Sequence, residues 1–199
     1  MSDRIDELAN AFARLPGIGP RQGKRFVFHL LGAPATERLR LAQLIEQLGS
    51  EVHQCPECRR FFTGAHRGPC NYCSGSIRDD SLLMLVEKDQ DLAVVERAGT
   101  YKGRYFVLGG VLTLSGKGAI READLIAAIK RRLDNGLQEV VLALSATSEG
   151  EHTTDRIREL LAPYRDHLTI SALGRGLATG SELEYADAET VRAAFAGRK

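Results

Sequence analysis

The sequence predicts an α/β protein built from four parts: a helical N-terminal segment, a short cysteine-rich segment, a parallel-sheet domain and a C-terminal helix. In the first fifty residues, apolar side chains recur at the three- and four-residue spacing of amphipathic helices. All four cysteines then fall between residues 55 and 73. From Ser81 onward, short apolar runs alternate with helical patterns, which is typical of a parallel sheet with helices on both faces. We place the four parts at residues 1–53, 54–79, 80–175 and 176–199.

Composition narrows the class of protein further. The 199 residues are 43% hydrophobic, which is enough to build a folded core. The 27 Lys and Arg residues nearly balance the 26 Asp and Glu residues, so net charge alone indicates no partner. No apolar run reaches the roughly 20 residues needed to cross a bilayer, and the N-terminus lacks the basic-then-apolar order of a signal peptide. We therefore expect a cytoplasmic location.

Three helices are predicted in the first part. The first spans about 3–14 and ends at Leu15-Pro-Gly-Ile-Gly-Pro20, whose prolines and glycines predict a tight hairpin. Pro20 suits the first turn of the second helix, because an N–H there would have no helical partner. The third helix spans about 36–48. The side chains expected to point inward are Phe26, Val27, Leu30 and Leu31 on the second helix and Leu41, Leu44, Ile45 and Leu48 on the third.

The hairpin resembles the helix-hairpin-helix element, which grips a nucleic-acid backbone without reading bases. In such a loop, glycine amides approach a phosphate together with the N-terminus of the second helix. No acidic residue occurs between Glu7 and Glu37, whereas several basic residues do. We therefore predict sequence-independent DNA binding; a plain helical turn with a solvated basic face is the alternative. The predicted DNA-binding residues are Gly17, Gly19, Arg21, Lys24 and Arg25.

The cysteines form two Cys-x-x-Cys knuckles separated by 11 residues: Cys55 with Cys58, and Cys70 with Cys73. This spacing lets four thiolates surround one zinc ion, and such a closed site leaves no position for water or substrate. We therefore predict one structural zinc per chain, with a redox dithiol or an iron–sulfur cluster as alternatives. The segment has too few apolar residues for a core of its own, so metal binding must hold it together. Two nearby histidines, His53 and His66, are expected to be solvent-exposed rather than spare ligands.

The parallel-sheet domain is predicted from four short apolar runs and the helical segments between them. The runs are typical of buried strands, and the segments show helical periodicity. The predicted strands span about 82–86, 105–108, 140–144 and 168–173, and the predicted helices span about 89–98, 122–133, 153–161 and, at the C-terminus, 188–195.

Three carboxylates follow two of these strands: Glu87 follows the first, and Glu149 and Glu151 follow the third. The carboxyl ends of parallel strands share one sheet edge, where open α/β folds place their sites. The arrangement resembles the Toprim domain of topoisomerases and primases, in which a strand-end Glu and an Asp-x-Asp pair hold magnesium for phosphoryl chemistry. Here the pair reads Glu-Gly-Glu, which disfavours a magnesium-dependent nuclease or primase-like enzyme. Solvated loop carboxylates with no joint role are the other alternative.

Two further chemistries find no support in the sequence. The stretch Gly110–Gly118 fails as a Walker A loop, because five residues separate its first two glycines and Gly118 stands where a Ser or Thr must bind magnesium. No Gly-x-Ser-x-Gly elbow occurs, every cysteine belongs to the knuckles, and His29, His152 and His167 lack a recognisable partner. Covalent catalysis therefore has no good candidate nucleophile in the sequence.

Taken in order, the hairpin, the knuckles and the Toprim-like region resemble the bacterial recombination mediator family RecR over nearly the whole chain. Similar local strings include Leu15–Pro20, Gly103–Gly110, Glu149–Glu151 and Glu182–Asp187. The chain departs from the family at Ser145-Ala-Thr-Ser-Glu-Gly-Glu151, where Asn-Pro-Thr-Val-Glu-Gly-Glu is usual, and in the segment 169–180. The resemblance therefore indicates a divergent member.

The resemblance implies a non-enzymatic DNA repair factor that acts with RecO, and sometimes RecF, to place RecA on single strands covered by single-strand-binding protein. It also implies ring-like dimers or tetramers that surround DNA. By position, Arg21 and Arg25 match the family's basic hairpin residues, and Lys24 is an extra cation. The acidic residues Glu87, Glu149 and Glu151 match the Toprim acids, which the resemblance assigns to partner docking. A DNA-binding module without a repair partner is a third class of function to consider.

Overall fold

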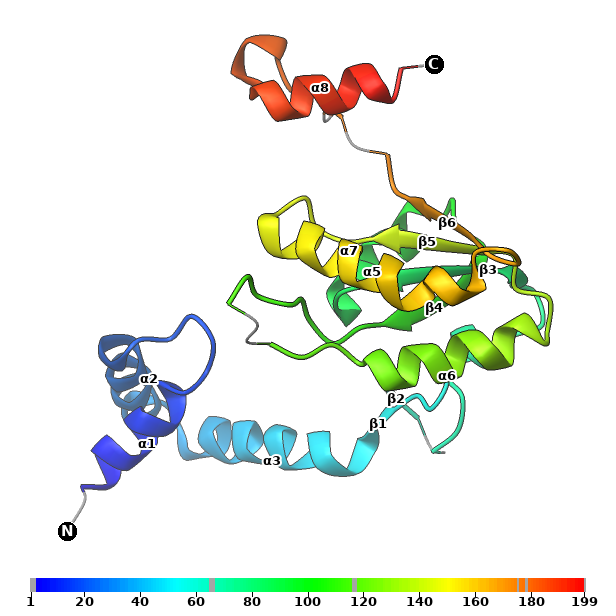
Figure 1. Ribbon diagram of the computed structural model, residues 1–199. Coiled ribbons are helices and arrows are strands. Elements are labelled where there is room, and N and C mark those ends of the chain that lie inside the picture. Colours follow the sequence, from blue (N-terminus) through cyan, green and yellow to red (C-terminus); the bar gives the residue numbers. More distant parts are fainter. Residues whose placement is uncertain (1–2, 65–66, 116–117, 175, 178, 199) are drawn as a thin grey trace. The chain divides into compact units, whose positions relative to one another are not determined.

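The computed structural model describes residues 3–64, 67–115, 118–174, 176–177 and 179–198. The chain divides into two compact units, Met1–His53 and Gln54–Lys199. Figure 1 shows the helical first unit and the second unit with its sheet.

The first unit contains α1 (Arg4–Phe12), α2 (Pro20–Gly32) and α3 (Ala35–Glu51). Asp3 begins α1 by accepting the N–H of Ile5 at 3.2 Å, and Pro20 is the first residue of α2, as predicted. The two helices cross closely at Gly23, where a Cβ atom would lie 2.5 Å from the carbonyl oxygen of Ala9. A glycine at this crossing lets α1 and α2 pack backbone against backbone.

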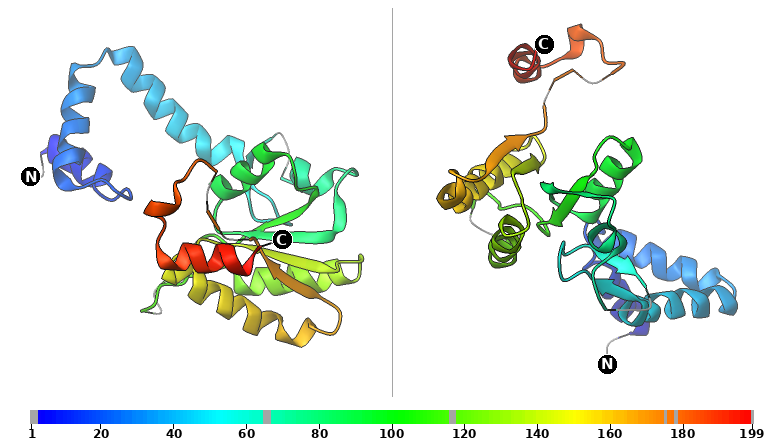
Figure 2. Two further views of the ribbon diagram at one scale, coloured as in Figure 1. Left: turned by 90° about the horizontal axis from the view of Figure 1, so that it is seen from above. Right: turned by 90° about the vertical axis from the view of Figure 1, so that its right-hand side faces the viewer.

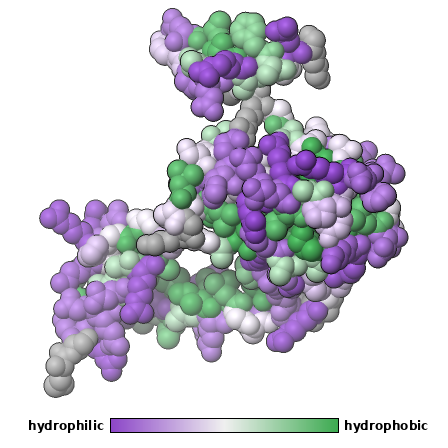
Figure 3. Space-filling view, viewed as in Figure 1, coloured by the Kyte–Doolittle hydropathy of each residue, from purple (hydrophilic) through white to green (hydrophobic). Residues whose placement is uncertain are grey.

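The helical periodicity predicted the helices of this unit, but the prediction of which side chains are buried is largely wrong. On α2 only Val27 and Gly23 are buried, whereas Phe26 and Leu31 are 44% and 56% exposed. On α3 no residue is buried, and the four side chains expected to point inward, Leu41, Leu44, Ile45 and Leu48, are 39–61% exposed. Figure 3 shows hydrophobic side chains gathered along α3. The physical reason is that no described element of this unit covers that side of α3.

The second unit is organised around a parallel sheet with strand order β4-β3-β5-β6. The central strand β3 pairs with β4 and β5, so that Leu85 stands opposite Phe106 on one side and Leu142 on the other. The strands are β3 (Asp79–Val86), β4 (Gly103–Val107), β5 (Glu139–Ala143) and β6 (Thr169–Ala172). The predicted strands match these closely, because buried strands read as continuous apolar runs.

Helices cover both faces of the sheet, as predicted, and Figure 2 shows them from two further directions. One face packs against α6 (Glu122–Leu133) and α7 (Ser148–Leu161) through a core that includes Phe106, Leu125 and Ile157. The other face packs against α5 (Asp89–Ala98) through Leu92, and Tyr105 lies in the same smaller core. The sheet is therefore buried between two apolar layers.

The start of α7 differs from the sequence prediction. The helix begins at Ser148 rather than near Thr153, because the side chain of Thr147 accepts the N–H of Gly150 at 3.1 Å and caps the helix there. The first turn is polar, so hydrophobic periodicity could not locate it. The helix thereby includes both acidic residues of the Glu149-Gly-Glu151 string.

The remaining elements are short. A two-stranded sheet, β1 (Val52–Gln54) with β2 (Phe61–Thr63), and the helix α4 (Asn71–Ser74) frame the cysteines. The 3₁₀ turns Ala162–Tyr164 and Leu183–Tyr185 and the helix α8 (Ala188–Ala196) complete the described chain. None of the helices in the described residues is long and apolar enough to span a membrane.

Candidate metal centre and nucleic-acid interface

The four cysteines meet in space. Their Sγ atoms all lie within 4.8 Å of one another, and the Sγ atoms of Cys58 and Cys70 are 3.6 Å apart. Four sulfurs at about 2.3 Å from one zinc ion would be separated by about 3.8 Å, so this cluster has the dimensions of a tetrahedral thiolate site. Within the described part of the chain, it is the only group of three or more His, Cys, Asp or Glu residues able to hold a metal.

Local backbone geometry shapes the first knuckle. The N–H of Cys55 donates to the carbonyl of Arg60 at 2.8 Å, and the N–H of Arg59 donates to the carbonyl of Cys55 at 3.0 Å. The turn requires a left-handed residue, and Arg59 adopts it with φ 63°. This turn brings Cys58 back toward Cys55.

The second knuckle is a helix start. Cys70 is the N-cap of α4, and the N–H of Cys73 donates to the carbonyl of Cys70 at 2.8 Å. The N–H of Cys70 also donates to the Sγ of Cys55 at 3.3 Å, which links the two knuckles. His53 is half-buried and is not part of the ligand group, whereas His66 lies outside the described residues.

The electrostatics of the cluster favour a cation. Hydrogen bonding between the side chains of Cys55 and Cys58 lowers the pKa of Cys55 and raises the pKa of Cys58. Four crowded sulfurs therefore cannot all ionise without a positive charge among them. A bound divalent metal supplies that charge, and three of the four cysteines are fully buried, so the donor set fits a structural metal.

The hairpin that joins α1 to α2 has the backbone expected of its glycines. Gly17 has φ +77°, a conformation that favours glycine, and the N–H of Ile18 donates to the carbonyl of Leu15 at 3.1 Å. Gly19 is the N-cap of α2, but its N–H already donates to Oε1 of Gln22 at 3.2 Å. A phosphate that approached this amide would have to displace the Gln22 side chain.

The predicted cations on α2 differ in their surroundings. Arg21 and Arg25 are exposed one helical turn apart. Lys24 is also exposed, but its Nζ lies 2.9 Å from Oδ1 of Asp6 on α1. The acid-free stretch in the sequence concealed this contact, because the packing of α1 on α2 brings in a carboxylate from outside that stretch. Arg21 and Arg25 are therefore the less compensated charges.

The predicted acidic residues lie at the carboxyl end of the sheet but do not form a metal-ligating group in the described structure. Glu87, just after β3, is only 8% exposed, and its Oε1 accepts the N–H of Ser145 at 2.6 Å. Glu149 and Glu151 are half-buried in the first turn of α7. Between them, Gly150 permits a close approach, because a Cβ atom there would lie 2.0 Å from the carbonyl oxygen of Ser145.

Two arginines next to the cysteine knuckles escaped sequence reasoning. Arg104 on β4 is 6% exposed and donates from Nη1 to the carbonyls of Tyr72 (2.8 Å) and Cys73 (3.0 Å). Arg121 donates from Nη1 to the carbonyl of Arg59 at 3.4 Å. No motif marks these arginines, because the carbonyls they bind lie some 30 and 60 residues earlier in the chain.

The geometry of the fold and of the site defines a class of protein. A helical hairpin unit, a four-cysteine metal module and a parallel sheet with an acidic carboxyl edge describe a Toprim-type protein with added modules. A family model for the Toprim domain matches residues 81–173, and models described as "RecR, helix-hairpin-helix" and "RecR, C-terminal" match residues 5–48 and 176–199.

Full-length relatives specify the family. The "Recombination protein RecR" of Cutibacterium acnes is 40% identical over 98% of this chain and 94% of its own length. The protein of the same name from Chlorobium phaeobacteroides is 38% identical, and the match spans 99% of this chain and 97% of that protein. The one from Streptomyces coelicolor is 36% identical, and the match spans 100% of this chain and 96% of that protein. The chain belongs to the RecR family of recombination proteins, which confirms the resemblance read from its motifs.

Proposed function

We propose that this protein is a recombination mediator that binds DNA without sequence preference and, with RecO and RecF, helps to load RecA onto single strands covered by single-strand-binding protein. It would act in the cytoplasm, on nucleoid DNA, and without catalytic turnover. The observation that carries this proposal is membership of the RecR family along the whole chain, combined with an exposed basic hairpin in the first unit.

The proposed DNA contact rests on the start of α2. Its first turn contains no acidic residue, and the positive end of the helix dipole lies at Gly19. Arg21 and Arg25 present two cations on adjacent turns beside that end. Phosphate contacts of this kind carry affinity but no sequence information. Binding should therefore be independent of sequence and steeply dependent on salt.

The acidic residues of α7 are proposed as a docking surface for a basic partner such as RecO. Charged groups at an interface steer association and fix register, so their loss weakens a complex in a salt-dependent way. Glu87 has a different part, because its hydrogen bond to the N–H of Ser145 supports the loop that precedes α7. A magnesium-dependent enzyme would instead lose turnover when Glu87 is replaced.

The metal is proposed to be one structural zinc per chain. Four thiolates at tetrahedral spacing are the donor set that zinc prefers, and no fifth donor joins them among the described residues. The residues that would hold it are Cys55, Cys58, Cys70 and Cys73. Its apparent binding energy, on the order of 10 kcal/mol in zinc-finger peptides, would replace the core that this segment lacks.

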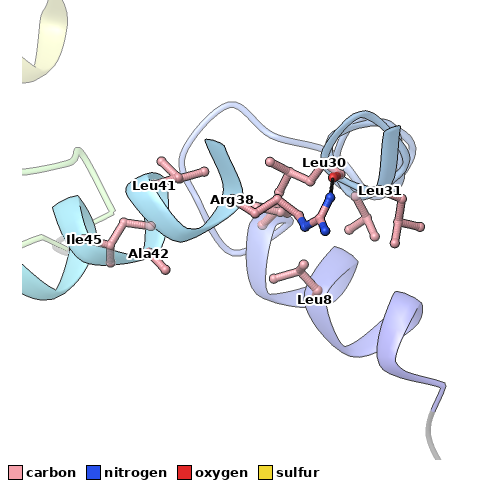
Figure 4. A pocket seen from close by; sticks show the side chains of 9 residues that line it. Leu8, Leu30, Leu31, Arg38, Leu41, Ala42 and Ile45 are labelled. Carbon is pink, nitrogen blue, oxygen red and sulfur yellow. Dashed lines mark hydrogen bonds between the residues drawn. The ribbon is translucent and has the colours of Figure 1, made fainter. Parts of the chain in front are cut away.

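Assembly into a ring-like dimer or tetramer is proposed to involve the first unit. An apolar pocket of about 260 Å³ opens between its three helices, and Figure 4 shows the leucines that line it. Arg38 reaches back from α3 and donates to the carbonyl of Leu30 at 3.1 Å and to that of Ala33. The pocket continues into the exposed apolar side of α3, and a second copy of the chain is the occupant that would cover both.

The experiment that tests the function measures DNA affinity and RecA loading on coated single strands. Changing both Arg21 and Arg25 to Glu should weaken binding to every sequence alike and reduce the salt slope by about 2. The control changes Arg97 and Arg165 to Glu, which alters the net charge equally outside the hairpin unit. Unchanged affinity in the hairpin variant would overturn the proposed DNA contact.

The docking surface is tested on α7 itself. Glu149→Gln and Glu151→Gln should weaken RecO binding and slow RecA loading, whereas Glu159→Gln on the same helix should not. Magnesium-dependent nicking or joining of DNA by the parent protein, lost in Glu87→Ala, would establish the enzyme alternative instead.

A further inference from the structure

β4 is an edge strand of the sheet: β3 pairs with it on one side, and no strand among the described residues pairs with it on the other. In a parallel pair, alternate residues of a strand bond to its neighbour. The N–H of Leu108 donates to the carbonyl of Val86, so residues 103, 105 and 107 direct their backbone groups outward. A strand edge left open in this way is a template for pairing with another chain.

Outward backbone groups near the two ends of β4, at residues 103 and 107, are bonded to residues outside the sheet. The N–H of Val107 donates to the carbonyl of Cys58 at 2.8 Å, so a metal-ligating residue is joined directly to the strand edge. The carbonyl of Val107 accepts from Nη1 of Arg121 at 2.8 Å, and that of Gly103 accepts from Nη1 of Arg78 at 3.0 Å. The cysteine module and its flanking arginines thus bond the edge of β4 at residues 103 and 107, where a fifth strand would otherwise pair.

Arg104 and Arg121 each connect one knuckle to the sheet. Arg104 binds the backbone of the second knuckle through the carbonyls of Tyr72 and Cys73, and its Nε is 2.7 Å from Oδ1 of Asp80, a β3 residue. Arg121 binds β4 through the carbonyl of Val107 and reaches the carbonyl of Arg59, beside the first knuckle. Because Arg104 is only 6% exposed, little water can compete for its hydrogen bonds.

We infer that the cysteine module is the cover of the free edge of β4, that Arg104 and Arg121 are positioning residues that hold the two knuckles against it, and that metal release and exposure of this edge are one event. This inference rests on the proposed metal binding. On this inference, the cysteine module protects the edge of β4 from pairing with another chain. Arg104 and Arg121 then slow metal release although neither is a metal ligand.

The experiment uses the full chain loaded with zinc(II), whose stoichiometry is measured first by elemental analysis. Failure to bind any zinc would refute the proposed metal, which is a separate result from the outcomes below. Zinc release into a chelating dye is then followed in the parent, in Arg104→Gln and in Arg121→Gln. We expect release at least tenfold faster in both variants, because each loses charge-assisted hydrogen bonds to the module.

Arg131→Gln is the matched control. Its guanidinium pairs with Glu57 of the same module at 3.1 Å but is 52% exposed and touches neither β4 nor a knuckle carbonyl in the described contacts. Its release rate should stay within twofold of the parent. The visible spectrum of the cobalt(II)-substituted variants should match that of the parent, which shows that the four thiolates still bind. If Arg104→Gln does not fold, Arg121→Gln carries the test alone.

Hydrogen exchange distinguishes a cover from a module that is merely attached. Chelation of the parent should raise amide exchange in residues 103–108 at least a hundredfold while residues 139–143 of the interior strand β5 stay protected. Protection of β4 that survives chelation, or zinc release from both variants at the parent rate, would overturn the inference.

Discussion

The substitution Gly23→Ala tests how closely α1 and α2 must approach to form the hairpin. A Cβ atom at position 23 would lie 2.5 Å from the carbonyl oxygen of Ala9 and 3.3 Å from the backbone nitrogen of Ala13. Both neighbours are backbone atoms, so relief requires the helices to separate rather than a side chain to rotate. Overpacking of this kind costs about 1–3 kcal/mol.

Helix propensity acts in the opposite direction. Alanine is favoured over glycine in a helix interior by about 1 kcal/mol, and Gly49→Ala on α3, where nothing lies within 4 Å of a new Cβ, should show that gain. At position 23 the clash with backbone outweighs the propensity, because the 2.5 Å contact is far inside van der Waals distance. We expect a net destabilisation of about 1–2 kcal/mol.

Urea titration of the full chain, followed by a probe in the first unit, measures this difference. The hairpin lies directly between α1 and α2, so DNA affinity of Gly23→Ala should fall together with stability. A Gly23→Ala protein as stable as Gly49→Ala would refute the close-approach reasoning and imply that the helices separate at no cost.

Three further outcomes are expected. Burial raises the pKa of Glu96, but hydrogen bonds including that from Arg78 lower it more, so its net pKa lies below the ordinary value of 4.5. The contribution of Glu96 to the free energy of unfolding should therefore be complete above pH 4.5 and decrease below it. In urea titrations, the difference in this free energy between pH 7 and pH 4 should be smaller for Arg78→Gln than for the parent. Gly150→Ala should lower the Tm in calorimetry and weaken RecO binding, because its Cβ would lie 2.0 Å from the Ser145 carbonyl; an unchanged Tm would contradict this. Cys58→Ser should leave less than half an equivalent of zinc in elemental analysis, and a full equivalent in folded protein would exclude the four-thiolate site.

Local signals in the sequence predicted most of this fold. The Cys-x-x-Cys spacing determines where four sulfurs can meet, and continuous apolar runs identify buried parallel strands, so both were predicted without tertiary knowledge. The hairpin was equally local, because Gly17 and Pro20 carry their backbone preferences with them.

What escaped prediction depends on contacts between distant segments. Hydrophobic periodicity located α3 but could not show that Leu44 and Leu48 remain exposed, since periodicity reports amphipathicity and not what covers the apolar face. The pairing of Lys24 with Asp6 and the hold of Arg104 on the second knuckle arise only when helices or strands pack. Charged side chains carry no periodic signal that would reveal such partners.

The left-handed backbone of Arg59 has a consequence for which residues this position accepts. Outside glycine, such a conformation costs about 1–2 kcal/mol, so local preference alone would select glycine here. The arginine side chain instead reaches Oδ1 of Asp124 on α6 at 2.6 Å. An asparagine would tolerate the backbone but is too short for that contact. Arg59 therefore has an unfavourable backbone conformation but joins the first knuckle to a helix more than sixty residues further along the chain. Substitutions at this position should separate the cost of the backbone conformation from the gain of the ion pair.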